Sequence, residues 1–513
     1  MTEHSLPQPS PAPQRVVVSL ALLLLASSAL PAAPARRAPK ILLAYTTAET
    51  TTSAAVVWNT DIAADSLVQY DTTSPVPADA LRVYSAAQVT VHDLQLEGLA
   101  PGTLYHYRVT SCAPKRGCVS ATGSFDTFPS CPDEVPAVSG SWQRADSPNV
   151  GESVGADNEL LAVTALASDD AWAVGWSQDP DGPPYVKLPL VQHFDDGAWN
   201  LVPSPSPAGA VQSVLHAVSG ASADDVWAVG SSHDGTLPSR TLIEHWDGVE
   251  WRIVPSPSPD TQLNELRGVA AVSADDAWAV GFRGGTHDET PLETLVLRWD
   301  GADWTQVASP SVPGGANQLF GVTALAADDV WAVGFAGGTP LAMRWNGSAW
   351  SVVPVKPDPG LGSEWLTAIA GTRGDDLWAV GQGTGVFVNR SFATLRHWDG
   401  VHWTQKVCRA RSSSNPPDGY EGGGPDSYFT GISAAAGDDV WAVGVVGSGP
   451  FLYHWDGAAW TQVTHPRAFP DSAVLRGVAT TSEGGAWSVG RTIAIDPSGQ
   501  TTTERTLVHA YSP

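Results

Sequence analysis

SADDVWAVG, residues 222–230, is one of seven related stretches that recur along the second part of the chain. Six copies keep the pattern D-D-x-W-A-V-G, and the last, GGAWSVG, is a weaker copy. Their tryptophans are Trp172, Trp227, Trp278, Trp331, Trp378, Trp441 and Trp487. Their spacing runs from 46 residues (Trp441 to Trp487) to 63 residues (Trp378 to Trp441). This length fits four short strands per copy, so the repeat predicts a seven-bladed β-propeller over residues 141–513.

The second copy shows how the strands of one blade follow one another: LHAVSGAS, DVWAVG, TLIEHWDG and WRIVPSPS, here named strands A to D. Strands A and B are small and apolar on both faces, as expected for inner strands packed between neighbouring blades. Strands C and D are joined by Asp-Gly or Asn-Gly dipeptides, which favour tight hairpins with positive φ at both central residues. These dipeptides are Asp247-Gly248, Asp300-Gly301, Asn346-Gly347, Asp399-Gly400 and Asp456-Gly457.

The two ends of the repeat region predict how the ring closes. The seventh copy ends the sequence at TLVHAYSP, which is a strand C with no strand D after it. The segment GSWQRADSP, residues 140–148, has the strand D pattern and precedes the first copy. We expect it to complete the seventh blade, which removes the open seam between the first and last blades.

Most tryptophans belong to the blade pattern and predict packing rather than ligand binding. Of the 22 tryptophans, 19 lie in strand B, before the turn between strands C and D, or at the start of strand D. The paired acids, such as Asp224-Asp225, recur in six copies, whereas a catalytic pair is needed once. We therefore expect them to hydrogen-bond nearby backbone amides at a tight strand connection.

A basic or titratable residue in strand C is a second repeated feature of the blades. We expect these side chains to stack on a neighbouring tryptophan or to pair with a turn aspartate. They are His193, His245, Arg298, Arg344, His397, His454 and His509.

Residues 38–130 show the short alternating strands of a β-sandwich, followed by a linker at 131–140. Ala54, Val56 and Trp58 share one strand face, and Tyr105, Tyr107 and Val109 share another. The complete expected fold class is therefore all-β: a β-sandwich followed by a seven-bladed β-propeller.

The stretch LEGLAPGTLYHYRV gives the sandwich a resemblance to a known family. Leu99, Pro101, Thr103 and Tyr105 match the L-x-P-x-T-x-Y pattern of fibronectin type III domains, in which the tyrosine makes a corner hydrogen bond. WNTD at 58–61 and DSLVQYD at 65–71 resemble the version that precedes the catalytic domain of purple acid phosphatases. No metal-ligand motif of those phosphatases follows residue 130, so the resemblance implies the companion domain without the enzyme.

The repeat resembles the seven-bladed propellers of secreted bacterial proteins. Its D-G-x-x-W turn is similar to a relaxed Asp-box of sialidase-type and photosystem-assembly-factor-type propellers. Only Asp195-Asp196-Gly197 keeps the Asp-x-Gly spacing, and the Asp-box is a structural element. The resemblance therefore implies a fold and no activity.

The N-terminus and the net charge predict an exported protein. Arg15 precedes an apolar run at 16–30, and Ala33-Pro34-Ala35 follows it, so residues 1–35 are expected to be a signal peptide. An uncleaved membrane anchor is the alternative, although 15 apolar residues are fewer than the about 20 of a membrane span. The net charge of −26 argues against a nucleic-acid partner. We expect a monomer that is secreted or held at the cell surface.

The four cysteines predict one local disulfide bond. Cys112 and Cys118 flank the short loop CAPKRGC and are expected to pair in an exported protein. The partners of Cys131 and Cys408 stay open. No cysteine pair has metal-binding spacing and no histidine cluster accompanies them, so neither a metal nor a cofactor is expected.

Function is expected where the copies differ, in the B-to-C and D-to-A loops that share one face of the propeller. Basic and aromatic residues of those loops are the candidate binding residues: Arg283, Arg390, Arg409, Arg411 and Tyr420. They predict a non-catalytic binding or scaffold protein that engages an extracellular glycan or protein, with the sandwich as a spacer.

The alternative is a polysaccharide-active hydrolase or lyase with its site in the propeller channel. It needs acidic and basic side chains that converge from several A strands. The A strands offer mainly small residues, with His216, Arg267 and Arg476 nearby, so no catalytic residue is predicted.

Overall fold

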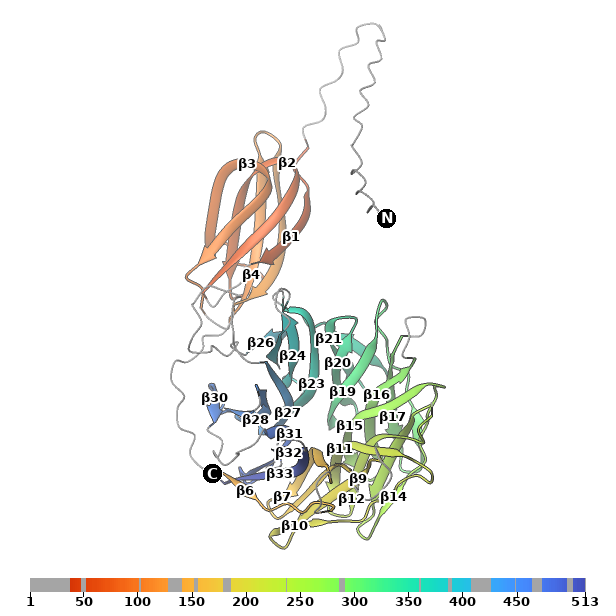
Figure 1. The fold of residues 1–513 in the computed structure, drawn as a ribbon. Helices are drawn as coiled ribbons and strands as arrows, with labels where there is room; N and C mark the ends of the chain where they lie inside the picture. Colours follow the sequence, from red (N-terminus) through yellow and green to blue (C-terminus); the bar gives the residue numbers. More distant parts are fainter. Residues whose placement is uncertain are drawn as a thin grey trace, which may run out of the picture.

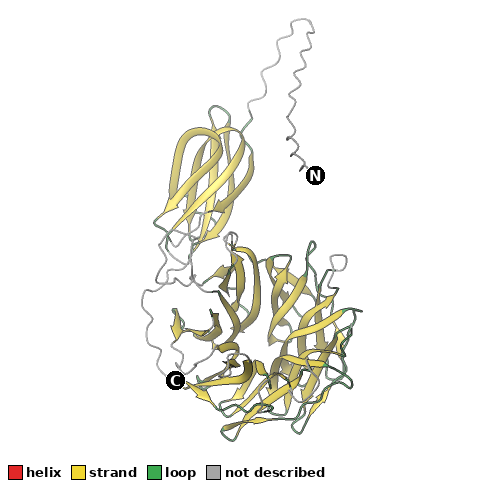
Figure 2. Cartoon of the chain, viewed as in Figure 1, coloured by secondary structure: helices red, strands yellow, loops and turns green. Residues whose placement is uncertain are grey.

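The computed structural model describes most of the chain: residues 37–47, 52–100, 103–127, 141–151, 156–178, 186–236, 238–285, 291–358, 361–385, 390–406, 426–447, 449–463, 473–495 and 502–512. All the regular secondary structure within these ranges is β-strand (Figure 2). The strands form one five-stranded sheet and seven four-stranded sheets. The fold is all-β, with a fibronectin type III-like β-sandwich followed by a seven-bladed β-propeller (Figure 1), which confirms the predicted class.

The sandwich contains five strands: β1 (Ile41–Thr47), β2 (Ser53–Asp71), β3 (Leu81–Glu97), β4 (Leu104–Ala113) and β5 (Gly117–Asp126). Their order is β1-β2-β4-β5, and β3 pairs with β2. The predicted inward face of β2 is fully buried, and Trp58 stacks on His92 with ring centroids 4.7 Å apart. The Tyr105 hydroxyl accepts a hydrogen bond of 2.9 Å from the Ala100 amide, which confirms the tyrosine corner.

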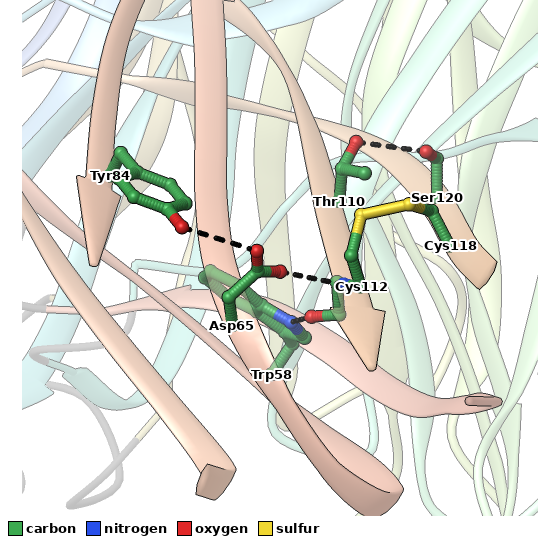
Figure 3. The surroundings of a disulfide bond; sticks show 8 residues. Trp58, Asp65, Tyr84, Thr110, Cys112, Cys118 and Ser120 are labelled. Carbon is green, nitrogen blue, oxygen red and sulfur yellow. Dashed lines mark hydrogen bonds between the residues drawn. A yellow bond between two sulfur atoms is a disulfide. The ribbon is translucent and has the colours of Figure 1, made fainter. Parts of the chain in front are cut away.

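A disulfide bond joins β4 to β5 at their connecting turn. Cys112 and Cys118 lie opposite each other in the strand register and are bonded, with their Cα atoms 4.0 Å apart (Figure 3). Beside this bond, the Asp65 carboxylate accepts hydrogen bonds from the Cys112 amide at 2.6 Å and from the Tyr84 hydroxyl at 3.3 Å. The disulfide bond therefore fixes the turn between β4 and β5, and Asp65 joins β2 to β3 and β4 beside it. Cys131 and Cys408 lie outside the described residues.

Each blade is one antiparallel sheet, and in the first six blades strands A to D follow one another along the chain. The first three blades are β7 (Asn158–Ala167), β8 (Asp170–Ser177), β9 (Leu188–Asp195) and β10 (Ala198–Leu201); β11 (Gln212–Ser222), β12 (Asp225–His233), β13 (Arg240–Trp246) and β14 (Trp251–Ile253); β15 (Leu263–Ser273), β16 (Asp276–Gly284), β17 (Glu293–Trp299) and β18 (Trp304–Gln306).

The next three blades repeat this order. They are β19 (Asn317–Ala326), β20 (Asp329–Ala336), β21 (Thr339–Trp345) and β22 (Trp350–Val353); β23 (Leu361–Arg373), β24 (Asp376–Gly385), β25 (Ser391–Trp398) and β26 (Trp403–Gln405); β27 (Ser427–Ala436), β28 (Asp439–Val446), β29 (Gly449–Trp455) and β30 (Trp460–Val463).

The seventh blade takes its outer strand from the other end of the propeller sequence. It consists of β31 (Ala473–Thr480), β32 (Ala486–Ile495), β33 (Thr502–Ser512) and β6 (Ser141–Ala145). In the pairing of β33 with β6, Tyr511 lies opposite Trp142. Each A strand contacts the A strands of both neighbouring blades, including β31 with β7, so the seven form a closed ring around the middle of the disc (Figure 1).

Tryptophans fill the space between blades, as the sequence pattern predicts. Trp227 of strand B is 1% exposed and contacts Trp299 and Trp304 of the next blade, at centroid distances of 5.0 and 5.2 Å. Its other ring neighbour is His245, which stacks on it at 4.2 Å. Equivalent contacts recur around the ring, so these aromatic side chains stabilise the contacts between blades.

The acidic pairs were predicted to bind backbone amides. In the structure, the second aspartate of each pair instead binds the basic side chain of strand C. Asp225 Oδ1 lies 2.7 Å from His245 Nε2 in the adjacent strand. Five further pairs repeat this contact at 2.7 to 2.9 Å: His193–Asp170, Arg298–Asp276, Arg344–Asp329, His397–Asp376 and His454–Asp439. The prediction that these bases stack on tryptophan and pair with turn aspartates is confirmed for six blades.

His509 is the exception, and its inclusion in this set was wrong. In the seventh blade Ala510, not His509, lies opposite Trp487. His509 pairs with Ser488 and is fully buried. This copy carries Gly484-Gly485 in place of the acidic pair and Ala510 in place of the base, so the seventh blade lacks this ion pair.

The turns between strands C and D also differ from the prediction. In the first blade both Asp196 and Gly197 have positive φ, at 52° and 79°. In the second blade only Gly248 does, at 86°, because Trp246 pairs with Trp251 and four residues span the turn. The Asp247 carboxylate instead accepts hydrogen bonds from the backbone amides of Val249 and Glu250, at 3.1 and 3.0 Å. The other dipeptides follow this second form.

Candidate functional site

The glycine of the repeated motif creates a bulge in every A strand. A Cβ at Gly230 would lie 1.8 Å from the carbonyl oxygen of Val214, so only glycine fits there. The strand register shifts next to this contact, between Leu215 and Ala217, which leaves His216 without an opposite residue. The same shift occurs in all seven blades. A β-bulge re-aims one side chain, so each blade presents one residue in the same way.

These bulges define two rings of residues around the propeller axis. The bulge ring contains the seven bulged residues, which are all half-buried: Leu161, His216, Arg267, Phe320, Thr367, Thr430 and Arg476. The upper ring contains the residues two positions earlier, nearer the variable-loop face: Glu159, Val214, Glu265, Gln318, Trp365, Tyr428 and Val474. We call the two rings together the axial site. Directly after the bulge every A strand continues with Ala or Gly, so the chemically varied side chains are confined to one end of the ring.

The small residues below the axial site let the A strands approach closely. A Cβ at Gly321 would lie 2.9 Å from the Cα of Ala368 in the next blade, and one at Gly477 would lie 3.2 Å from the Cα of Ala162. The A strands are therefore packed against one another beneath the two rings, and the axial site lies at the end that faces the variable loops.

Charged residues of the seventh and first blades meet in one network. Glu159 is 4% exposed, and its carboxylate accepts hydrogen bonds from Arg476 Nε at 2.8 Å and Trp176 Nε1 at 3.1 Å. Arg491 lies 3.4 Å from the same carboxylate and pairs with Glu504. Burial lowers the pKa of Arg491, but the charges of Glu159 and Glu504 outweigh burial and raise it. In this network both arginines are bound to carboxylates.

Lys187 extends this network toward the second blade. Its amino group lies 3.5 Å from the ring centre of Trp176, which is a cation–π contact. Its backbone bonds to strand A of the second blade through Val211 and Ser213. Burial lowers the pKa of Lys187, and Arg491 lowers it further, while Glu159 and Glu504 oppose the shift. The lysine therefore lies within electrostatic reach of the whole network.

His216 and Arg267 occupy the next two blades of the bulge ring. Burial lowers the pKa of His216 well below its usual value, and the charges of Arg267 and Lys187 add to this shift. The imidazole is therefore neutral at neutral pH. Arg267 donates a hydrogen bond of 2.6 Å to Glu265 of the upper ring, while its Nε is buried without a hydrogen-bond partner.

The fourth to sixth blades contribute aromatic and hydroxyl side chains. Trp365 of the upper ring meets Phe335 of the neighbouring blade edge to face, with centroids 6.3 Å apart and planes at 89°. Trp365, Phe335, Phe320 and Tyr428 are all half-buried. The Thr367 and Thr430 hydroxyls donate hydrogen bonds to carbonyls of their own and the next blade, at 2.8 to 3.1 Å. The axial site therefore has an aromatic half in the fourth to sixth blades and a charged half in the other blades. Trp176, Lys187, Arg491 and Glu504 adjoin the charged half and are counted with it.

Two of the five predicted loop residues lie in the described part of the chain, and they belong to different blades. Arg283, in β16 of the third blade, is bound to Glu293 of the adjacent strand at 2.5 Å. Arg390 precedes β25 of the fifth blade, where its carbonyl accepts a hydrogen bond from Gly385 at 3.0 Å. Arg409, Arg411 and Tyr420 lie outside the described residues. These five residues remain a prediction for binding.

Sequence reasoning identified His216, Arg267 and Arg476 but missed the other half of the axial site. Two tryptophans could have signalled it. Of the 21 tryptophans after residue 130, Trp176 and Trp365 alone fall outside the blade pattern, and both lie at the axial site. A residue that breaks a packing repeat is a candidate for another role.

Neither a metal centre nor a membrane-spanning helix occurs in the part of the chain that the structure describes. No group of three or more His, Cys, Asp or Glu side chains there is arranged to hold a metal ion. No helix in the same ranges has the length and apolar character needed to cross a membrane.

Comparison with known proteins gives a family match for the sandwich. Residues 39–127 match the family model of the purple acid phosphatase N-terminal domain, in agreement with the resemblance of the sandwich. No curated protein matches the chain.

The similar solved structures include a peptide complex, a protein of unknown function and a polysaccharide lyase. YCF48 bound to D1 peptide has 14% identity and a TM-score of 0.45, with 75% of this chain and all of that chain covered. A protein of unknown function from Dyadobacter fermentans has 8% identity and a TM-score of 0.39, with 73% and 100% covered. A PL25 ulvan lyase has 8% identity and a TM-score of 0.43, with 69% and 94% covered. At these identities the likeness concerns the fold alone.

Proposed function

We propose that this chain is an exported, non-catalytic binding or scaffold protein that engages an extracellular glycan or protein through the variable-loop face of its propeller. The axial site carries this proposal. It is a place where equivalent positions of the seven blades differ, whereas the D-D-x-W-A-V-G segment of strand B repeats in six blades. Ligand sites combine apolar and aromatic walls with a few placed polar groups, and the two halves of the axial site supply both.

Binding is favoured over catalysis by the state of the carboxylates. Glycosidases use a pair of carboxyl groups, one as acid and one as base or nucleophile. The two carboxylates of the axial site, Glu159 and Glu265, each accept hydrogen bonds from an arginine. Such pairing occupies carboxylate oxygens that a general acid or base would need for proton transfer. The structures similar in fold include both a peptide complex and a polysaccharide lyase, so they do not separate the two functions.

The sandwich is proposed to be a spacer, and residues 1–35 are proposed to direct export, with an uncleaved anchor as the alternative. The secreted or cell-surface location and the monomeric state are part of the same proposal. The net charge of −26 supports a partner other than nucleic acid.

The test compares two matched arginines of the third blade. The purified protein is screened against immobilised extracellular polysaccharides and peptides, and released sugar is assayed in parallel. Arg267 and Arg283 each pair with a glutamate, at 2.6 and 2.5 Å, but only Arg267 belongs to the axial site. We expect binding without product, weakened about tenfold by Arg267→Ala and less than about twofold by Arg283→Ala. A larger effect of Arg283→Ala would move the site to the outer loops, and released sugar would establish the enzymatic alternative.

A further inference from the structure

The balance of charges in the axial site points to the chemistry of its ligand, and this inference rests on the proposed binding function. We propose that the axial site binds a neutral saccharide. The aromatic half takes the faces of sugar rings, and the charged half takes their hydroxyl groups.

Each guanidinium of the charged half already has a carboxylate partner. Arg267 is bound to Glu265, Arg476 to Glu159, and Arg491 to Glu504. An anionic ligand would be repelled by the three carboxylates Glu159, Glu265 and Glu504, and Lys187, the remaining cation of the network, already packs on Trp176. The chain as a whole carries a net charge of −26, which repels an anionic polymer before contact.

A neutral hydroxyl can use the same network without breaking it. A guanidinium has five N–H donors, and a carboxylate has about four acceptor positions. Arg267 donates only through Nη2 to Glu265, and its Nε has no hydrogen-bond partner. An ion pair of this kind presents donors and acceptors side by side, which matches the mixed donor and acceptor character of adjacent sugar hydroxyls. His216 adds a neutral ring with a lone pair, because burial and the nearby cations lower its pKa.

The aromatic half supplies an apolar surface for the faces of the sugar rings. A pyranose ring has an apolar C–H face that packs on the face of a flat aromatic ring. Trp365 is half-buried, lies outside the tryptophan set that packs the blades, and is braced by Phe335 at 89°. A braced aromatic side chain loses little conformational entropy when a ligand binds. The two halves together suit a ligand with apolar faces and uncharged polar edges.

The experiment uses two polymers with the same backbone and different charge. Hydroxyethyl cellulose is neutral and carboxymethyl cellulose is anionic, and neutral galactomannan, arabinoxylan and pullulan and anionic polygalacturonate and alginate extend each class. Affinity electrophoresis of the full-length protein measures retardation at about 0.05 and about 0.5 M NaCl. We expect retardation by one or more neutral polymers that is unchanged by salt.

Three variants separate the two halves of the site. Trp365→Ala is expected to weaken retardation by the neutral polymer at least about tenfold. Val249→Ala, at an 80%-exposed side chain in a turn of the opposite face, is the control and should leave it unchanged. Glu265→Gln keeps the shape of the ion pair but leaves the charge of Arg267 unbalanced. It should create a new, salt-sensitive retardation by the anionic polymers. Thermal unfolding confirms that each variant is folded.

The outcomes distinguish failure of the inference from failure of the function. Retardation of the unaltered protein by anionic polymers alone, lost at high salt, would overturn the neutral-saccharide inference and leave the binding function standing. The same holds if Trp365→Ala is folded and binds the neutral polymer as before. Binding to peptides and to no polymer would overturn the inference and leave only a protein partner. No binding in either screen would overturn both.

Discussion

Arg476 Nε lies 2.8 Å from Glu159 Oε1, and this ion pair joins two blades whose partners are 317 residues apart in the chain. The pair lies beside the seam where the seventh blade meets the first. Glu159 also accepts a hydrogen bond from Trp176 and lies 3.4 Å from Arg491, so one carboxylate binds two donors and lies beside a second guanidinium group. The same residues therefore close the ring and form the charged half of the axial site.

The first prediction concerns the stability of that seam. Glu159→Ala leaves Arg476 and Arg491 partly buried with fewer carboxylate partners, and we expect a loss of about 2–4 kcal/mol in the free energy of unfolding. Glu265→Ala removes a more exposed partner of one arginine and should cost less than about 1 kcal/mol. Urea unfolding followed by tryptophan fluorescence measures both variants. Equal losses would show that the seam does not depend on Glu159.

The second prediction is a pH dependence that originates in strand C of the second blade. Burial raises the pKa of Glu244 to about 8, although the Ser204 hydroxyl donates a hydrogen bond to it at 2.6 Å. The unfolded chain releases this proton near pH 4.5 and the folded chain near pH 8. Between these values the folded state binds more protons, so the stability falls as the pH rises through that window.

Glu244→Gln should remove this fall and stabilise the protein at pH 8 by about 1–3 kcal/mol. The first blade supports the change, because Gln192 occupies the same position. Gln192 accepts a hydrogen bond from Ser147 and donates one to the Pro148 carbonyl. Glu250→Gln, on an exposed side chain of the same blade, is the control. Thermal unfolding between pH 4 and 8 compares the variants, and identical pH profiles for Glu244→Gln and the unaltered protein would contradict the assignment.

The third prediction separates the two members of the repeated acidic pair. Asp225 is buried and binds His245, whereas Asp224 is exposed and accepts a hydrogen bond from Ser222. Asp225→Ala should cost about 1–2 kcal/mol, and Asp224→Ala less than about 0.5 kcal/mol. Chemical denaturation gives both values. Neither change should alter ligand binding, and a loss of binding in folded Asp225→Ala would restore a functional role to the pair.

The fourth prediction tests the origin of the bulge. A Cβ at Gly230 would collide with the Val214 carbonyl, so Gly230→Ala must displace strand A of the second blade. We expect a loss of about 2–4 kcal/mol in stability. Ser231→Ala, one residue further along, should change the stability by less than about 0.5 kcal/mol. Wild-type stability in Gly230→Ala would show that the bulge does not require glycine.

The local pattern of the repeat predicted the strands and their number because each copy contains the residue pattern of its own strands. The tryptophan spacing gave seven blades, and the terminal segments predicted the partner of β33. The same reasoning failed at His509, because Ala510 occupies the strand C position that faces the tryptophan in this blade and His509 lies one residue earlier. It also failed at most Asp-Gly turns, since the number of residues in a turn depends on which tryptophans pair.

The sequence by itself determined the blades, their order and the means of closing the ring, because short-range periodicity and turn residues specify each sheet. The tertiary structure alone decided which variable residues meet. A bulge shifts the register by one residue, ring closure brings Glu159 beside Arg476, and the packing of the fourth blade on the fifth brings Phe335 beside Trp365. These relationships depend on contacts between blades, which the spacing of residues along the chain does not predict.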